Sequence, residues 1–190
     1  MIKLLAISGS LRSRSYNSAL LRAAADLAPV GVAVEIAPIH DIPLYNGDME
    51  DATGLPEAVR NLKTAIRHAD GLLLATPEYN NSIPGVMKNA IDWLSRPAAD
   101  IPAVFGDLPV AIIGASPGGF GTVLAQAAWL QVFRALGTRA WFGDRLLVSR
   151  AGHVFDAQMM LADDAIREQL REFIARFAEI SASAPRRHAH

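Results

Sequence analysis

The sequence contains no cysteine among its 190 residues, and this absence excludes several kinds of chemistry. Disulfide bonds, thiolate nucleophiles and cysteine-ligated metal centres all require that side chain. The five histidines are scattered, at positions 40, 68, 153, 188 and 190, and their spacing matches no metal-ligand set. The composition therefore gives no reason to expect a metal site, and it fits a reducing compartment such as the cytoplasm.

An excess of charge of one sign is also missing, because 18 Lys and Arg residues stand against 19 Asp and Glu residues. This balance gives no electrostatic reason to expect a nucleic acid or an acidic membrane surface as partner. No apolar run approaches the ~20 residues that a membrane-spanning helix needs, and no signal segment is recognisable after Met1. We expect a soluble cytoplasmic protein whose 51% hydrophobic content suits one domain with a sizeable core.

Strand-like and helix-like segments alternate along the chain. Apolar runs predict five strands, at residues 3–8, 32–37, 71–75, 109–115 and 139–147. Apolar residues at helical spacing predict helices at residues 17–27, 56–67, 84–94, 122–136 and 163–180, with irregular loops at 38–54 and 97–107. This order predicts a doubly wound α/β fold in a single domain, residues 1–180, followed by a disordered tail, residues 181–190. Such a sheet binds its ligand at the carboxyl ends of its strands.

The loop after the first strand has the features of a phosphate site. The apolar run ends at Gly9, and a polar loop with Ser10, Arg12, Ser15 and Asn17 then leads into a helix. Backbone N–H groups and the helix dipole hold a phosphate in this geometry, while hydroxyls add donors and arginine adds charge. Neither Gly-x-Gly-x-x-Gly nor the P-loop motif is present, so the loop is suited to one terminal phosphate. The alternative is an ordinary connection with a serine cap.

The loop after the third strand, residues 76–85, combines two prolines with Tyr79 and two asparagines. An aromatic side chain beside stiff backbone suits a flat heteroaromatic ring, which needs stacking and in-plane hydrogen bonds. The alternative is a surface turn whose asparagines tolerate unusual dihedral angles. A third loop, residues 116–122, carries the pair Gly118 and Gly119, which lets a ligand approach bare N–H groups. Read alone, this loop is better explained as a flexible turn, but all three loops fall at one end of the sheet.

Two motifs resemble those of the NADPH-dependent FMN reductase family, which includes chromate-, quinone- and azo-reducing flavoproteins. The first motif is Gly9-Ser10-Leu11-Arg12-x-x-Ser15-x-Asn17. The second is Thr76-Pro77-Glu78-Tyr79-Asn80-x-Ser82-x-Pro84-Gly85-x-x-Lys88-Asn89-Ala90-Ile91-Asp92-Trp93. The similarity runs from Met1 to about Val148. It implies a flavodoxin-like three-layer sandwich with a five-stranded parallel sheet in the order 2-1-3-4-5.

The resemblance also implies which residues contact bound FMN. The residues that would hold its phosphate are Ser10, Arg12, Ser15, Asn17 and the amide of Tyr16. Those that would line the isoalloxazine are Pro77, Glu78 (largely through its backbone), Tyr79 and Asn80, with Ser116, Gly118 and Gly119 on the pyrimidine side. One departure from the family pattern concerns the third loop, where Phe120 and Thr122 flank a single Gly121.

The function that the resemblance implies is an NAD(P)H-dependent oxidoreductase in which the flavin carries the chemistry and no side chain is catalytic. Hydride would pass from NADPH or NADH to FMN and then to a quinone or similar small acceptor, in ping-pong order. The resemblance also implies a homodimer or homotetramer, to which residues 127–133 could contribute unless they pack on the sheet. Two other classes stay open: a flavodoxin-type electron carrier and a non-catalytic phosphate- or nucleotide-binding module.

Overall fold

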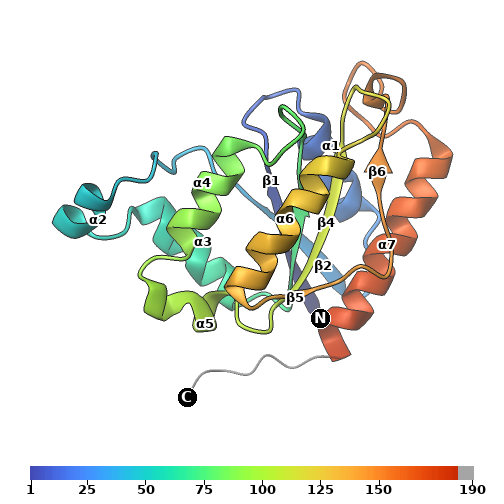
Figure 1. Cartoon of the computed structure of the whole chain (residues 1–190). Helices are drawn as coiled ribbons and strands as arrows, with labels where there is room; N and C mark the ends of the chain where they lie inside the picture. Colours follow the sequence, from blue (N-terminus) through green and yellow to red (C-terminus); the bar gives the residue numbers. More distant parts are fainter. Residues whose placement is uncertain (184–190) are drawn as a thin grey trace.

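Six strands form the central sheet of the computed structural model, which describes residues 1–183 (Figure 1). The order of the main path is β2 (Val32–Ala37), β1 (Ile2–Ser8), β3 (Gly71–Ala75), β4 (Pro109–Ala115) and β5 (Arg139–Ala140), with all neighbours parallel. The sixth strand, β6 (Leu147–Val148), also pairs with β4. The flavodoxin-like order 2-1-3-4-5 is therefore confirmed.

The centre of the sheet is apolar because helices cover it on both faces. Strands β3 and β4 are buried along their whole length, and β1 is buried from Leu4 onward. Continuous apolar runs of this kind are typical of central parallel strands. The edge strand β2 is only half-buried. The rigid part of the sheet thus consists of the three strands whose carboxyl ends carry the loops of interest.

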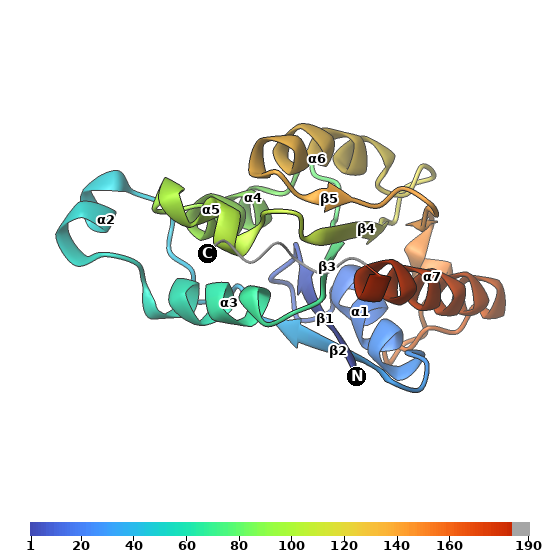
Figure 2. The ribbon, with the colours of Figure 1, turned by 90° about the horizontal axis from the view of Figure 1, so that it is seen from below.

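Helices form the two outer layers (Figure 2). One face carries α1 (Tyr16–Asp26) and α7 (Asp164–Ser183). The helices on the other face are α3 (Glu57–Arg67), α4 (Gly85–Leu94), α5 (Ile101–Val104) and α6 (Val123–Leu136). Helix α2 (Gly47–Thr53) stands away from the body between β2 and α3, and none of its residues is buried (Figure 1). Short 3-10 turns cover Ala98–Asp100 and Ala151–His153.

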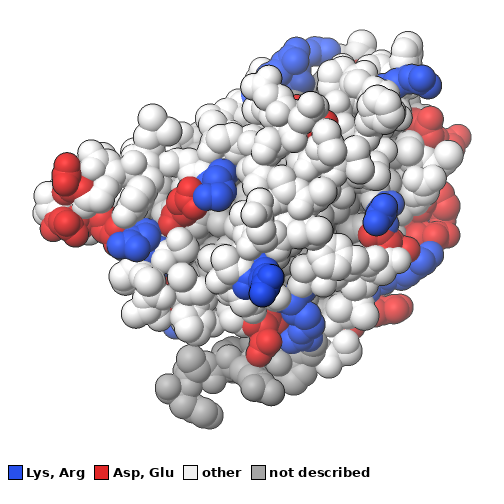
Figure 3. Space-filling model, viewed as in Figure 1, with Lys and Arg blue, Asp and Glu red and all other residues white. Residues whose placement is uncertain are grey.

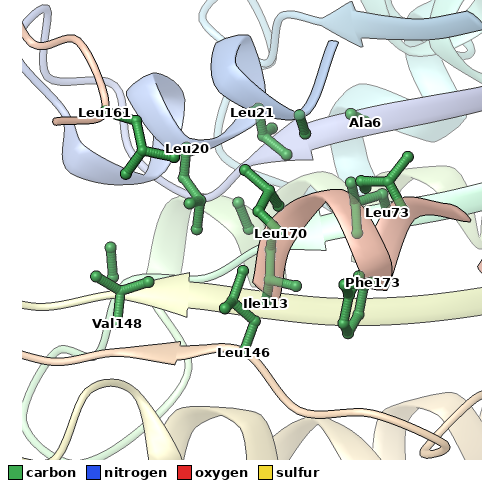
Figure 4. Close-up of a cluster of buried hydrophobic side chains, with 14 of the residues drawn as sticks. Ala6, Leu20, Leu21, Leu73, Ile113, Leu146, Val148, Leu161, Leu170 and Phe173 are labelled. Carbon is green, nitrogen blue, oxygen red and sulfur yellow. The ribbon is translucent and has the colours of Figure 1, made fainter. Parts of the chain in front are cut away.

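Side chains that alternate along the strands divide the core into two clusters. In β1, Leu4 and Ala6 belong to the cluster beneath α1 and α7, whereas Leu5 and Ile7 belong to the cluster beneath α3 to α6. Figure 4 shows the first cluster, in which side chains of α1 and α7 meet those of the strands; among them are Leu20, Leu21, Leu170, Phe173, Leu73 and Ile113. Both clusters pack on β1, β3 and β4, which fixes the ends of these strands.

The predicted last strand, residues 139–147, is interrupted. Residues 141–146 leave the sheet between β5 and β6. Trp141 still donates its main-chain N–H to Val110 O in β4 at 2.8 Å, while its ring packs on α7 against Phe173 and Phe177, with centroids 5.0 Å and 5.7 Å away. The chain leaves β4 after Trp141 and returns at Leu146, whose carbonyl accepts from Gly114 N at 3.2 Å, just before β6.

Other boundaries also differ from those predicted. Helix α7 continues to Ser183, so residues 181–183 are helical rather than part of a tail, and Ser181 is buried. Residues 184–190, the rest of the predicted tail, lie outside the described residues. Both loops predicted to be irregular contain a short helix, α2 and α5. Within residues 127–133, Trp129 and Phe133 pack on the sheet in the core, whereas Leu130 is 46% exposed, so a contribution of this segment to an interface stays a prediction.

Helix α6 approaches the carboxyl ends of β3 and β4 very closely. A methyl group at Gly114 would lie 2.1 Å from Thr122 Oγ1 and 2.4 Å from the main-chain oxygen of Thr76. Real Cβ atoms do not come so near to other atoms, so only glycine fits at this position. The absence of one side chain therefore sets the distance between β3, β4 and the beginning of α6.

We expect Gly114→Ala to destabilise the protein by roughly 1–3 kcal/mol, because the new methyl group meets main-chain atoms that cannot rotate away. Gly85→Ala is the matched control, because a Cβ at Gly85 would meet no heavy atom within 4 Å. Chemical denaturation of the two variants without added ligand measures the difference. Equal midpoints for both variants and the parent would contradict the proposed close approach.

Candidate cofactor site at the carboxyl ends of the strands

Three loops meet at one end of the sheet, at the top in Figure 1. Main-chain hydrogen bonds continue past the strand ends: Gly9 donates to Ala75 at 2.8 Å and Thr76 to Ile113 at 2.9 Å. The loops after β1, β3 and β4 are therefore neighbours, as the sequence predicts. Basic side chains lie at this upper edge of the surface in Figure 3, over the loops at the carboxyl ends of the strands.

The loop between β1 and α1 presents an open helix N-terminus. Ser15 is the N-cap of α1, and its Oγ accepts a hydrogen bond from Ser18 N at 3.2 Å. The first-turn N–H groups of Tyr16 and Asn17 have no partner within the helix. Ser10 and Ser15 are buried, while Arg12 is exposed and its side chain makes no hydrogen bond or ion pair with the described residues. Unused N–H donors and an unpaired guanidinium therefore lie on the same loop.

Asn17 makes a structural contact that was not predicted. Its Nδ2 donates to Ala115 O and its Oδ1 accepts from Ala115 N, both at 2.9 Å, and the side chain is buried. These two bonds fasten the first turn of α1 to the end of β4. Any contact of Asn17 with a ligand is thereby left to its main-chain N–H and its second amide proton. Tyr16, the neighbouring residue, stacks its ring on Phe155 with the centroids 5.7 Å apart.

The loop after β3, residues 76–85, is a tight hairpin, and we call it the ring loop. Tyr79 and Ser82 exchange main-chain hydrogen bonds of 3.2 Å and 3.1 Å around Asn80 and Asn81. Both asparagines have positive φ angles, 51° and 60°, which is the pattern of a type I′ turn. The predicted alternative, a turn with asparagines at unusual dihedral angles, therefore describes the backbone correctly. The turn leaves Tyr79 48% exposed.

Gly9, at the start of the loop between β1 and α1, lets that loop contact the ring loop. A Cβ at Gly9 would lie 2.7 Å from Met87 Sδ and 2.8 Å from Pro77 Cδ, so no side chain fits there. Pro77 is itself buried. Packing against the ring loop therefore requires glycine at position 9. The sequence alone does not indicate this contact.

The Glu78 side chain bonds to α6, which leaves the main chain of Glu78 for the predicted contact with the flavin. Its Oε2 accepts hydrogen bonds from Leu124 N at 2.8 Å and from Ala125 N at 2.9 Å, in the first turn of α6. Thr122, the N-cap residue of α6, makes no side-chain capping bond. Glu78 therefore caps α6 from another loop.

The loop after β4 is tied to a segment that the sequence analysis did not include. Ser116 O accepts from Ala151 N at 3.1 Å, and Gly118 O accepts from Arg150 N at 2.8 Å. Gly119 is open, because a Cβ there would meet nothing within 4 Å. Arg150 has a φ angle of 47°, which is unusual for a residue other than glycine. Residues 150–151 thus belong to the wall of the site.

Residues 114–118 match Gly-x-Ser-x-Gly, the nucleophile pattern of many serine hydrolases. The local geometry differs from that of an activated nucleophile. Ser116 Oγ accepts a hydrogen bond from Gly118 N at 3.1 Å, which closes a small turn. Within residues 1–183, Ser116 makes no hydrogen bond to a histidine. The match therefore does not support a hydrolase.

A long strap, residues 38–54, runs from β2 past α4 and includes α2. Pro43 O accepts hydrogen bonds from Asn89 Nδ2 at 2.8 Å and from Trp93 Nε1 at 2.9 Å. Tyr45 N donates to Asn89 Oδ1 at 2.8 Å, and the Tyr45 ring lies edge-on against Trp93 at 4.9 Å. Both α4 residues belong to the second family-like motif, so part of that motif fastens the strap.

A charged cluster holds the outer part of the strap. Glu50 Oε2 accepts from Tyr45 Oη and from Arg96 Nε, both at 2.9 Å, and the Arg96 guanidinium lies 5.9 Å from the Tyr45 ring centroid. The hydrogen bond from Arg96 lowers the pKa of Glu50, and the hydrogen bond to Glu50 raises the pKa of Tyr45. The same carboxylate raises the pKa of Arg96.

Residues 1–183 contain neither a metal-binding group of side chains nor a helix that could span a membrane. Among residues 1–183, no group of three or more His, Asp or Glu side chains is arranged to hold a metal ion. In the same part of the chain, no helix has the length and apolarity needed to cross a membrane.

The fold and these loops define a flavodoxin-type α/β protein with an open helix N-terminus after β1 and an exposed aromatic side chain after β3. The sequence model of the family described as NADPH-dependent FMN reductase matches residues 2–152. The chain belongs to this family, and the assignment made from its two motifs is confirmed.

Individual relatives agree with the family assignment. An NAD(P)H-dependent FMN reductase of Pseudomonas aeruginosa is 49% identical over 171 residues, which cover 90% of each chain. A 2-hydroxy-1,4-benzoquinone reductase of a Burkholderia species is 37% identical over 177 residues, covering 93% of this chain and 94% of that one. Among solved structures, the flavoenzyme FerB of Paracoccus denitrificans, an NAD(P)H:(acceptor) oxidoreductase, superposes with a TM-score of 0.86 at 32% identity. The superposition covers 97% of this chain and 99% of FerB.

We expect Glu50→Gln to loosen the strap, because the neutral amide weakens the bonds to both Tyr45 and Arg96. Limited proteolysis at neutral pH should then cut residues 44–53 faster than in the parent. Asp48→Asn is the control, because its exposed carboxylate on the same helix makes no bond to another side chain. Equal cleavage rates in Glu50→Gln and the parent would show that the α4 contacts alone hold the strap.

The same cluster predicts a pH dependence for the parent protein. Because its folded-state pKa is lowered, the contribution of Glu50 is complete above the ordinary carboxyl value and is lost as pH falls through the lowered value. Near-UV circular dichroism from Tyr45 should therefore stay constant at neutral pH and change only in acid, and Glu50→Gln should abolish that acid transition.

Proposed function

We propose that this protein is an NAD(P)H-dependent oxidoreductase that holds FMN at the carboxyl ends of β1, β3 and β4 and reduces a quinone or similar small acceptor. The observation that carries the proposal is the open N-terminus of α1 next to the unpaired Arg12, on the loop that carries the first family motif. The relatives described above, reductases of FMN and of a benzoquinone, support this substrate class.

The donors around α1 fit a phosphate monoester. First-turn N–H groups, the hydroxyls of Ser10 and Ser15 and the guanidinium of Arg12 offer hydrogen bonds and positive charge over one short loop. Two other helices begin at this edge. Helix α6 has its N2 and N3 donors occupied by Glu78, and α4 follows the ring loop at Pro84 without a side-chain cap. An anion at this end of the sheet therefore finds free helix donors at α1 rather than at α6.

The remaining loops fit the ring system. Tyr79 offers an exposed aromatic face on a stiff turn, and Pro77 and Asn80 flank it in the same loop. Across the edge, Gly118 and Gly119 carry no side chain that would keep a ring away from the main chain. Flat ligands that need both a stacking surface and main-chain hydrogen bonds fit such a pair of walls.

When bound, FMN would accept a hydride from a reduced nicotinamide and return the electrons to an acceptor. The protein contributes binding, orientation and electrostatics. Arg12 and the α1 N-terminus would anchor the phosphate, the ring loop would orient the isoalloxazine, and main-chain N–H groups of residues 116–119 would stabilise negative charge on the pyrimidine side. No described side chain is required as an acid or base for the hydride step.

We also propose a homodimer or homotetramer. Several large apolar side chains beside the site are exposed, notably Phe120 at 84%, Phe142 at 57% and Leu124 at 47%. Monomeric proteins rarely leave such groups together in water, so a second subunit is a natural cover. Light scattering after gel filtration measures the oligomeric state, and a monomer at micromolar concentration would contradict this part of the proposal.

Arg12→Ala should weaken FMN binding about ten- to hundredfold, because a charge-assisted bond to the phosphate contributes roughly 1.5–3 kcal/mol. Riboflavin has no phosphate and should bind the variant and the parent equally. Titration of flavin fluorescence measures both affinities. An unchanged affinity for FMN would place the phosphate elsewhere and overturn the assignment of this loop.

Initial-rate kinetics test the order of the reaction. With one candidate site for both substrates, varied nicotinamide and quinone should give parallel double-reciprocal lines. NADPH or NADH alone should bleach the flavin absorbance in stopped flow before any acceptor is added. Intersecting lines without bleaching would instead require both substrates to be bound at once, and a flavodoxin-type carrier would show no steady turnover with quinones.

A further inference from the structure

We infer that Glu78 is a positioning residue whose carboxylate joins the ring loop to α6, so that FMN affinity depends on a helix cap. The inference rests on the proposed function, because it concerns how that flavin site is held in shape. The Glu78 side chain is not proposed to contact the flavin, because it accepts its two hydrogen bonds from the main chain of α6.

The geometry is that of an N-cap supplied from a distant segment. A helix leaves its first N–H groups without partners, and an N-cap side chain normally accepts from N2 or N3. In α6 these are Leu124 and Ala125, the two residues that donate to Glu78. Thr122 is fully buried, and its Oγ1 instead accepts from Gln126 Nε2 at 3.1 Å. The first turn of α6 has no acidic residue of its own, so the cap comes from the ring loop.

A second contact shows that the ring loop and α6 form one unit. Trp129 Nε1, farther along α6, donates to Thr76 Oγ1 at 3.2 Å, and that hydroxyl donates to Pro77 O at 2.9 Å. Thr76 and Trp129 are both fully buried. Glu78 and Thr76 thus hold the ring loop on either side of Pro77, and Glu78 is the last attachment to α6 before the exposed turn that carries Tyr79.

The negative charge of the cap has a separate effect on ligand binding. A carboxylate at a helix N-terminus compensates the positive end of the helix dipole. Glu78 therefore removes α6 as a competing anion site and leaves the N-terminus of α1 open. Replacement by glutamine keeps an oxygen acceptor but loses this charge, so the two contributions can be separated.

The test compares Glu78→Ala and Glu78→Gln with a matched control, Asp163→Ala. Asp163 also caps a helix with a carboxylate, because its Oδ1 accepts from Ile166 N at 2.9 Å in α7. Three measurements are made on each full-length variant: the unfolding temperature without flavin, the FMN dissociation constant, and the visible circular dichroism of bound FMN. The dissociation constant and the visible circular dichroism report on the flavin site itself, and a loss of stability alone does not change them.

We expect both alanine variants to unfold at lower temperature, since each loses a helix cap. Only Glu78→Ala should bind FMN about five- to tenfold more weakly and change the visible dichroism, and Glu78→Gln should restore most of the affinity. If Glu78→Ala does not fold, Glu78→Asp, whose shorter side chain cannot span the same gap, takes its place.

The inference is overturned if Glu78→Ala and Asp163→Ala both bind FMN with the parent's affinity and spectrum, because Glu78 would then be a stabilising cap only. It is also overturned if Glu78→Gln binds as weakly as Glu78→Ala while a Glu78→Asp variant binds normally, since charge rather than the bridge would then be required. A parent protein that binds no flavin would instead refute the proposed function. The first two outcomes leave that function intact, so the two failures are distinguishable.

Discussion

The close contact between α6 and the carboxyl ends of β3 and β4 is the constraint on which the candidate site depends. At Gly114 the sheet leaves no room for a methyl group, because Thr122 and the carbonyl of Thr76 lie directly against it. This contact brings the first turn of α6 within reach of Glu78, and the buried Thr76 hydroxyl within reach of Trp129. Without it, the ring loop would lose both of its attachments to α6.

Two of the helices that begin at this edge, α1 and α6, are used in opposite ways. The donors of α6 are satisfied inside the protein by Glu78, whereas those in the first turn of α1 are available to a ligand. Asn17 keeps α1 in place by binding both main-chain groups of Ala115, so the open helix end does not depend on a ligand for its position. The site is therefore shaped mainly by main-chain geometry, and rather few side chains are left to contact a cofactor.

Much of this architecture could be predicted from the sequence, because apolar runs and glycines report local preferences directly. The run at residues 71–75 predicted β3 to the residue, and three loops were placed at the correct edge. The packing of the Trp141 ring could not be predicted, since its partners Phe173 and Phe177 lie in a helix more than thirty residues later. Helix α2 was missed because none of its residues is buried, so it has no apolar periodicity to detect.

In the candidate site, too, the sequence predicts residue types but not contacts between distant segments. The side chains of Ser10, Arg12 and Tyr79 indicate their chemistry from residue type alone, and all three residues lie on loops at the carboxyl ends of the strands, as predicted. The tasks of Asn17 and the Glu78 side chain could not be inferred, because their partners lie 98 and 46 residues away and are main-chain atoms of no particular sequence. A family motif records that such residues occur together, but not which of them touch the ligand.

The bond between Asn17 and Ala115 also bears on the order in which the protein is made. Its two ends are separated by 98 residues, so a growing chain cannot close it until β4 has left the ribosome. The loop proposed to receive the phosphate is synthesised within the first seventeen residues, yet it reaches its final form only after more than half of the polypeptide has been translated. The proposed cofactor site is therefore completed late in biosynthesis, because a nascent chain that ends before Ala115 carries the motif without the partner of Asn17.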